Sequence, residues 1–201
     1  MIILVLLQMA YHLIGDLLHE WMGIMLFGLL ILHNILDWKW YSNLFKGKYT
    51  PVRIFHTTIN LLLLVSFLCT AVSTVFLSPT ISVIFHLKAV LLGRRMHMVF
   101  TTWSFVLTSA HIGLHWNRGI GGLKKHSKRT QCLYRFSIML VSGYGLYAFI
   151  SRELLQRMLF LSEYAFFNYE ETMIHFIIDH IAILCLLSCF TYGVRQFIAK
   201  H

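Results

Sequence analysis

Long hydrophobic runs separated by short polar segments dominate the chain. They predict six helices, at about residues 1–15, 19–38, 52–77, 95–116, 133–150 and 172–198. Five of these runs have 18 residues or more, about the length that crosses the hydrocarbon core of a bilayer. The first is short for a span, as expected if the natural chain starts upstream of Met1. The pattern predicts an all-α, multi-pass membrane helical bundle that forms a single domain over residues 1–201.

Glycines and polar residues mark the connections between the runs. Gly15 and Asp16 separate the first two helices, KGKYTP (46–51) is a loop, and RGIGGLKKHSKR (118–129) is a glycine-rich basic loop. The segment 151–171 carries leucines at helical spacing, which predicts a helix that lies in the membrane interface.

Composition and charge support the membrane assignment. Hydrophobic residues make up 58% of the chain and charged residues 12%, about half the charge of a soluble domain. The net charge is +9, but the basic residues lie in short loops, so membrane orientation explains them better than nucleic acid, and no nucleic-acid partner is expected. Six spans place twelve of the 17 basic residues on one side, at 39, 46, 48, 53, 118, 124, 125, 128, 129, 135, 195 and 200.

This asymmetry predicts the orientation of the bundle. Basic loops stay in the cytoplasm, so we expect both termini to be cytoplasmic. The helices 19–38 and 95–116 then both run from outside to inside, parallel to each other.

Four histidines on these two helices have matching positions. His19 and His33 are 14 residues apart, as are His97 and His111. Fourteen residues rise roughly 21 Å and return to within about 40° of the same helix face. We therefore expect His19 to meet His97 near the outer surface and His33 to meet His111 near the inner surface. Two imidazoles fill both axial positions of a haem iron, which favours electron transfer over catalysis on a bound ligand.

Other residues near these histidines each have more than one interpretation. His115 lies 18 residues after His97, a poor match to the spacing on the other helix, and is a propionate partner, an alternative ligand or an interfacial residue. Arg94 and Arg95 pair with haem propionates or are interfacial arginines. Gly23, Gly28 and Gly113 make room for the flat ring or allow close helix packing.

The remaining candidates are weaker. His56, and Asp179 with its neighbour His180, are candidates for a proton or quinone site. The alternative, which we favour for His180, is a packed polar pair. His175 is expected at a solvated helix end. The four cysteines form no CxxC or CxxCH motif, so neither a zinc site nor covalently attached haem is expected.

Two segments carry a family resemblance. The HEW at 19–21, the histidine of ILHN (31–34) and the HIGLHW at 111–116 resemble the flavinylation-associated cytochromes, which are small bacterial cytochrome b-like membrane proteins. The resemblance covers residues 10–116, and the histidine pairs are also similar to those in the cytochrome b subunit of quinol-oxidising respiratory complexes.

The resemblance implies two non-covalent haem b groups in a four-helix cytochrome b-like core at about 16–116, with accessory helices at 133–150 and 172–198. It implies a bacterial inner-membrane protein that passes electrons from cytoplasmic or quinol donors to a separate extracytoplasmic flavin-bearing partner. It therefore implies an electron-transfer protein or oxidoreductase subunit rather than a stand-alone enzyme.

Two other functions stay open. One is a quinol-oxidising membrane anchor of a reductase, which would need a quinone pocket near His180 or His56. The other is a haem-free, histidine-lined transporter of metal ions or protons, which would need carboxylates that converge with the histidines. A purely structural anchor leaves the four matched histidines unexplained.

Overall fold

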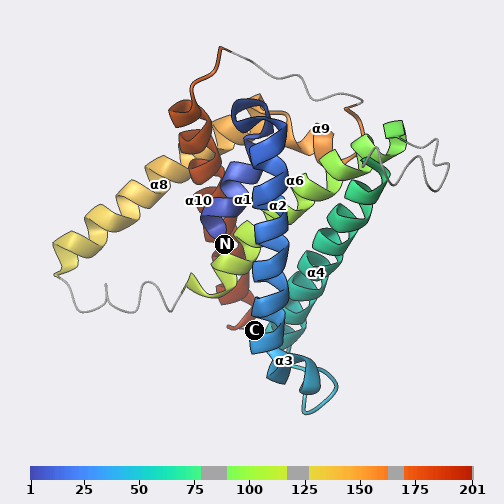
Figure 1. Ribbon diagram of the computed structural model, residues 1–201. Coiled ribbons are helices and arrows are strands. Elements are labelled where there is room, and N and C mark those ends of the chain that lie inside the picture. The colour runs from blue at the N-terminus through green and yellow to red at the C-terminus, as the bar shows by residue number, and fades with distance from the viewer. Residues whose placement is uncertain (78–89, 117–126, 163–169, 201) are drawn as a thin grey trace.

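The computed structural model describes residues 1–77, 90–116, 127–162 and 170–200, which are helical with no strand in those ranges (Figure 1). The long helices lie where the hydrophobic runs predict them, and this confirms the all-α class. They are α2 (Tyr11–Leu36), α4 (Pro51–Leu77), α6 (Val90–Leu114), α8 (Lys128–Ser151) and α10 (Met173–Ile198). The short helices are α1 (Ile2–Met9), α3 (Trp38–Ser42) and α9 (Leu154–Met158).

Four helices, rather than the predicted six, qualify as membrane spans in the described ranges. α2, α4, α8 and α10 are long and apolar enough to cross a membrane. The prediction of a span at 1–15 is wrong, because α1 has 8 residues, roughly 12 Å of helix against about 30 Å of hydrocarbon. α6 has 25 residues and is long enough, but it is not among the helices with a stretch apolar enough to qualify.

The break predicted at Gly15 is a kink inside α2. Gly15 has φ 76 and ψ 171, a conformation that only glycine adopts without strain. The first helix has already ended at Met9, and Ala10 connects it to α2. The chain continues past Ala10 and turns back at Gly15, so α1 packs beside the part of α2 that follows the kink.

α2, α6 and α10 point in one direction, and α4 and α8 point in the other (Figure 1). α2 and α6 therefore run in the same general direction, as predicted, but α6 crosses α2 at a steep tilt instead of lying alongside it. α3, the start of α4 and the C-terminal end of α10 lie at the lower end in this view, which brings Lys39, Arg53 and Arg195 to the same end of the bundle.

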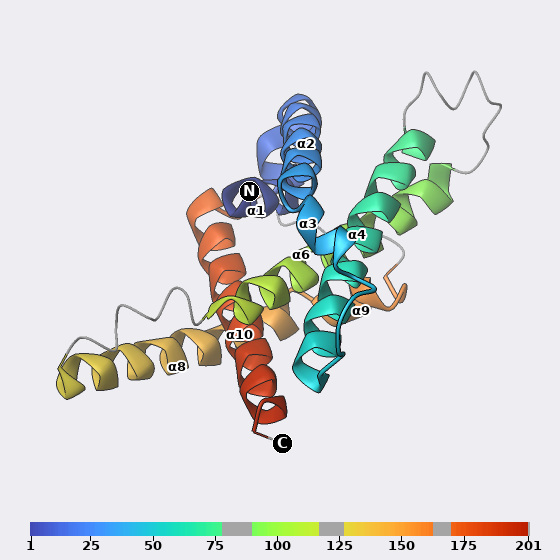
Figure 2. The same ribbon diagram turned by 90° about the horizontal axis from the view of Figure 1, so that it is seen from below.

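α6 is the central helix and packs between α4 and α10 (Figure 2). Its polar side chains find partners on these neighbours. Ser104 donates to the hydroxyl of Ser66 at 3.1 Å, and Ser188 of α10 donates to the carbonyl of Ser109 at 2.7 Å. Small polar residues allow helices to approach closely and to bond across an interface inside a membrane. This explains how α6, which does not qualify as a span, can be the most enclosed of the long helices.

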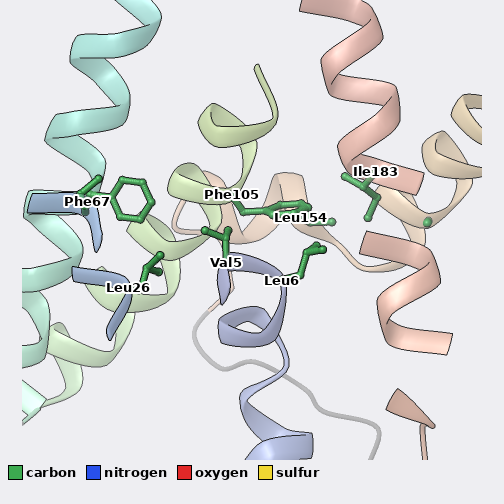
Figure 3. Close-up of a cluster of buried hydrophobic side chains, with 9 residues drawn as sticks. Val5, Leu6, Leu26, Phe67, Phe105, Leu154 and Ile183 are labelled. Carbon is green, nitrogen blue, oxygen red and sulfur yellow. The ribbon is translucent and has the colours of Figure 1, made fainter. Parts of the chain in front are cut away.

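A cluster of buried apolar side chains joins α1, α2, α4, α6, α9 and α10 (Figure 3). Val5 of α1 lies between Leu26 of α2 and Phe105 of α6, and Leu6 lies on the side of Leu154 and Ile183. Leu154 is also buried here, so the predicted interfacial helix at 151–171 is realised only as the short α9, partly in the core. Residues 163–169 lie outside the described ranges.

α2 is the least enclosed of the four candidate membrane spans. Only 6% of its most apolar window is buried, against 28% for α4 and 33% for α10. α2 contacts the rest of the protein mainly through α1 and through the buried residues Leu26 and Leu30. Both of these leucines lie on the helix face that carries His19 and His33.

Candidate functional site

The structure brings His19 of α2 and His97 of α6 together, as predicted. Their ring centroids lie 6.2 Å apart, and the ring planes are inclined by 71°. Two imidazoles that share one metal ion, with metal–nitrogen bonds of about 2.1 Å, have centroids roughly 6 Å apart. The separation of this pair is therefore compatible with a shared metal, as is the equal separation of His56 and His115.

A serine on α4 sets the tautomer of His97. The Ser73 hydroxyl donates its only proton to the carbonyl of Thr70 at 2.6 Å, and Nδ1 of His97 lies 3.1 Å from the same oxygen. Ser73 must therefore accept from His97, so Nδ1 carries the proton and Nε2 has a free lone pair. Metal-bound histidines are usually held in this way, by a bond from the ring nitrogen that does not bind the metal.

α1 and the start of α2 position His19. Gln8 donates to the backbone carbonyl of His19 at 2.9 Å, and the Tyr11 ring meets the His19 ring edge-on at 5.1 Å. Tyr11 in turn donates to Asp16. Nδ1 of His19 is buried without a hydrogen-bond partner in the described part of the chain, which is an uncompensated cost for a purely structural histidine.

His111, near the opposite end of α6, is oriented in the same manner as His97. Its Nδ1 lies 2.9 Å from Oδ1 of Asn60 on α4. An amide oxygen only accepts, so Nδ1 carries the proton and Nε2 is again free. α4 thus supplies one orienting side chain for each histidine of α6.

The structure does not bring His33 and His111 into contact. The His33 side chain is 49% exposed, and its Nε2 lies 3.6 Å from a carboxylate oxygen of Asp37, one turn along α2. Among the described residues, the ring next to His111 is His115, at 4.9 Å between centroids. The predicted inner contact is not formed because α2 packs mainly on α1 and has few contacts with α6.

Two further residues, His56 and Arg195, lie beside His111 and His115. The sequence indicated only the first of them. His56 of α4 lies 6.2 Å from His115 between ring centroids. Arg195 of α10 donates from Nε to Nε2 of His56 at 3.0 Å. The sequence marked His56 only as a polar candidate, and no local signal singled out Arg195, which is 139 residues away.

The glycines near the histidines have different surroundings. A Cβ on Gly113 would lie 2.4 Å from the carbonyl oxygen of Ser188, so the structure favours close packing of α6 on α10 over room for a porphyrin. Gly28 lies on the face of α2 opposite His19 and has open space around it. Gly23 faces Gln8 of α1.

The two arginines before His97 lie in the first turns of α6. Arg94 is exposed and Arg95 is half-buried. Both lie within one turn of His97, at the end of α6 that holds the contact with His19. This position is compatible with each of the two interpretations of these arginines.

A polar network lies beside the outer histidines and ties α8 to α10. Arg152, just after α8, donates to Glu171 and also to Oδ2 of Asp179 at 2.8 Å. Tyr144 donates to the other oxygen of Asp179. Potential metal-ligating atoms of Glu171, His175 and Asp179 lie within 4.8 Å of one another. Because the guanidinium already holds both carboxylates, the network is an ion-pair clamp between helices.

Charge stabilises this clamp. Burial by itself would raise the pKa of Glu171, but the hydrogen bonds and charge of Arg152 hold that pKa below its ordinary value. Burial likewise opposes the charged form of Arg152, and the two carboxylates nevertheless raise its pKa. Both groups are therefore ionised at neutral pH.

His180 is buried and packed, as expected, but it does not form the favoured polar pair with its neighbour Asp179. Its Nδ1 lies 2.9 Å from the backbone carbonyl of Phe176. The ring stacks on Phe176 at 3.9 Å and meets Phe105 edge-on at 5.5 Å. The neighbouring Asp179 faces Arg152 instead.

Comparison of the chain with protein-family models, curated proteins and solved structures finds no match.

Proposed function

We propose that this protein conducts electrons across a membrane through two b-type haems, each held by two histidines. The observation that carries the proposal is the pair His19 and His97, with ring centroids 6.2 Å apart on two helices that point the same way. When bound, a bis-histidine haem supplies a one-electron redox centre with no open coordination position.

The outer residues fit such a group. Nε2 of His97 is free because Ser73 holds Nδ1, and His19 has a buried ring nitrogen that no described protein group satisfies. A lone structural histidine would need neither feature. The orienting bond and the matched ring separation together support a shared metal.

The inner histidines fit a haem held by two histidines only in part. His111 has a free Nε2 and an orienting partner in Asn60. For His33 to be the second ligand, its side chain must leave Asp37 and turn toward α6. The equal spacing of 14 residues on both helices supports this assignment, and His115 is the alternative ligand that lies in contact with His111.

The two histidine levels are roughly 21 Å apart along the helices, so two haems would form a path between the basic and the acidic ends of the bundle. We propose that the basic end faces the cytoplasm of a bacterial inner membrane. The resemblance to flavinylation-associated cytochromes supports cytoplasmic or quinol donors and an extracytoplasmic flavin-bearing acceptor.

Absorption spectroscopy of the protein purified in detergent tests the proposal. We expect a Soret band, a split α band after reduction with dithionite, and about two haems per chain by the pyridine haemochrome method. A preparation that stays colourless after expression with added haem would refute the proposal and favour the transporter.

Single substitutions test the pairing. His19→Ala and His97→Ala should remove one and the same haem, and His111→Ala should remove the other. His175→Ala is the matched control, because this histidine is exposed and belongs to the ion-pair clamp. Loss of different haems from the His19 and His97 variants would show that the outer pair is wrong.

The position of the second inner ligand needs one more comparison. His33→Ala should remove the same haem as His111→Ala, and His115→Ala should retain it. The opposite result would assign the inner ligand to His115 and overturn the assignment of His33.

A further inference from the structure

A hollow lies at the basic end of the bundle, between α3, the segment that follows it and the first turns of α4. Its volume is about 670 Å³, within the range of about 300 to 1,000 Å³ that is usual for ligand sites. Lys39, Lys46 and Arg53 line it together with Trp40, and none of the described residues that line it is acidic. The lining therefore favours an anion.

Arg53 is held in place by neutral groups beside the hollow. Arg53 donates from Nη2 to the carbonyl of Asn43 at 2.7 Å and from Nη1 to that of Lys48 at 3.2 Å. Its guanidinium also lies over the Tyr49 ring, 4.3 Å from the centroid. Neutral partners surround Arg53, so its positive charge is not cancelled.

The two lysines are available for a ligand. Lys39 and Lys46 are exposed, and neither forms an ion pair within the described part of the chain. The start of α4 adds to the positive potential, because Thr50 and Val52 also line the hollow and the N-terminal end of a helix carries partial positive charge.

The position of the hollow indicates which anion would reach it. α2 ends at Leu36 and α4 begins at Pro51, and both are candidate membrane spans, so the segment between them lies at the membrane surface. Phe45, next to Lys46, is 91% exposed, and Trp38 is 69% exposed. Large exposed aromatic side chains beside basic residues are typical of segments that rest in the headgroup region.

From the size of this hollow, its positive charge and its position at the membrane surface, we infer that it binds a phosphate ester, supplied by the headgroup of an anionic phospholipid. Lys39 and Lys46 contact the phosphate, while Arg53 fixes the segment and adds to the field. The exposed apolar surface of α4 beside the hollow, which includes Ile54 and Leu61, lies alongside the acyl chains. The inference does not depend on the haems.

Native mass spectrometry of the full chain in detergent, with added lipid, tests the inference. We expect one phosphatidylglycerol to be retained under conditions that remove phosphatidylcholine, and phosphatidylglycerol to raise the temperature of unfolding more than phosphatidylcholine does. Each lysine near an anionic surface contributes about 1 kcal/mol. Lys39→Gln/Lys46→Gln should therefore weaken retention at least about tenfold.

The control is Lys128→Gln/Lys200→Gln, which removes the same charge from exposed positions outside the hollow and should retain phosphatidylglycerol like the unmodified protein. Equal retention of the two lipids, or equal loss in the two double variants, would overturn the inference. Inorganic phosphate is the second probe. If phosphate stabilises the protein as well as phosphatidylglycerol does, and only when both lysines are present, the assignment to a lipid headgroup is wrong.

Discussion

The ion-pair clamp at the end of α8 makes a large and measurable contribution to stability. The side chain of Arg152 is 17% exposed, and those of Glu171 and Asp179 are 8% and 6% exposed. Substitution Arg152→Leu would leave two carboxylates whose remaining basic neighbours are the histidines His12 and His175. Breaking a buried ion pair by removing one partner costs about 3–5 kcal/mol, and we expect the lower end because the arginine is partly solvated.

The assay is thermal unfolding in detergent, followed by the helical circular dichroism signal. For a chain of 150–250 residues, 1 kcal/mol lowers the midpoint by about 2–4 °C, so a loss of about 3 kcal/mol predicts a decrease of roughly 6–12 °C. Arg135→Leu is the matched control, because Arg135 lies on the same helix and is exposed. It should shift the midpoint by less than about 2 °C.

A second variant separates the ion pair from simple packing. Arg152 also lies over the Phe176 ring, 4.8 Å from the centroid, so Arg152→Leu removes that contact as well. Arg152→Leu/Glu171→Gln/Asp179→Asn should recover part of the loss, since no buried charge is then left without a partner. If Arg152→Leu unfolds like the control, or if the triple variant is no more stable than Arg152→Leu, the clamp does not act through charge.

Three further results are expected. Ser73→Ala and Asn60→Leu should each speed haem loss to apomyoglobin by about 10- to 100-fold, since they remove the bonds that orient the α6 histidines, and unchanged rates would show that these bonds do not serve a metal. Gly113→Ala should cost about 1–3 kcal/mol in unfolding because its Cβ meets the backbone of α10, whereas Gly28→Ala should be neutral, and equal effects would refute the packing argument. Because the folded pKa of Glu171 lies below its ordinary value of 4.5, its contribution is complete above that pH and is lost as the pH falls through the folded pKa. Glu171→Gln should flatten this part of a stability–pH curve, and an unchanged curve would contradict the assignment.

The sequence predicts much of the candidate site, because helical periodicity converts spacing into position. The equal separations from His19 to His33 and from His97 to His111 predict matching faces and levels, and the contact of His19 with His97 follows once the helices are parallel. The inner pair was not predictable in the same way. Whether His33 faces Asp37 or α6 depends on side-chain rotamers and on the distance of α2 from its neighbours, which spacing does not determine.

The residues that orient the α6 histidines, Asn60 and Ser73, could not be predicted from the sequence for a related reason. Asn60 lies 51 residues from His111, and Ser73 lies 24 residues from His97. Polar residues like these occur throughout the helices. Their register against α6 is decided by the packing of the small residues between α4 and α6.

The sequence by itself determined that the protein is a helical membrane bundle with histidines at two levels, because hydrophobic length and helical spacing are properties of single segments. Only the tertiary structure decided that α1 is too short to span, that α6 is the enclosed helix, and that Arg152 joins Glu171 to Asp179. Each of these outcomes depends on which helices become neighbours. That choice is made by packing and by the pairing of charges between segments far apart in the chain.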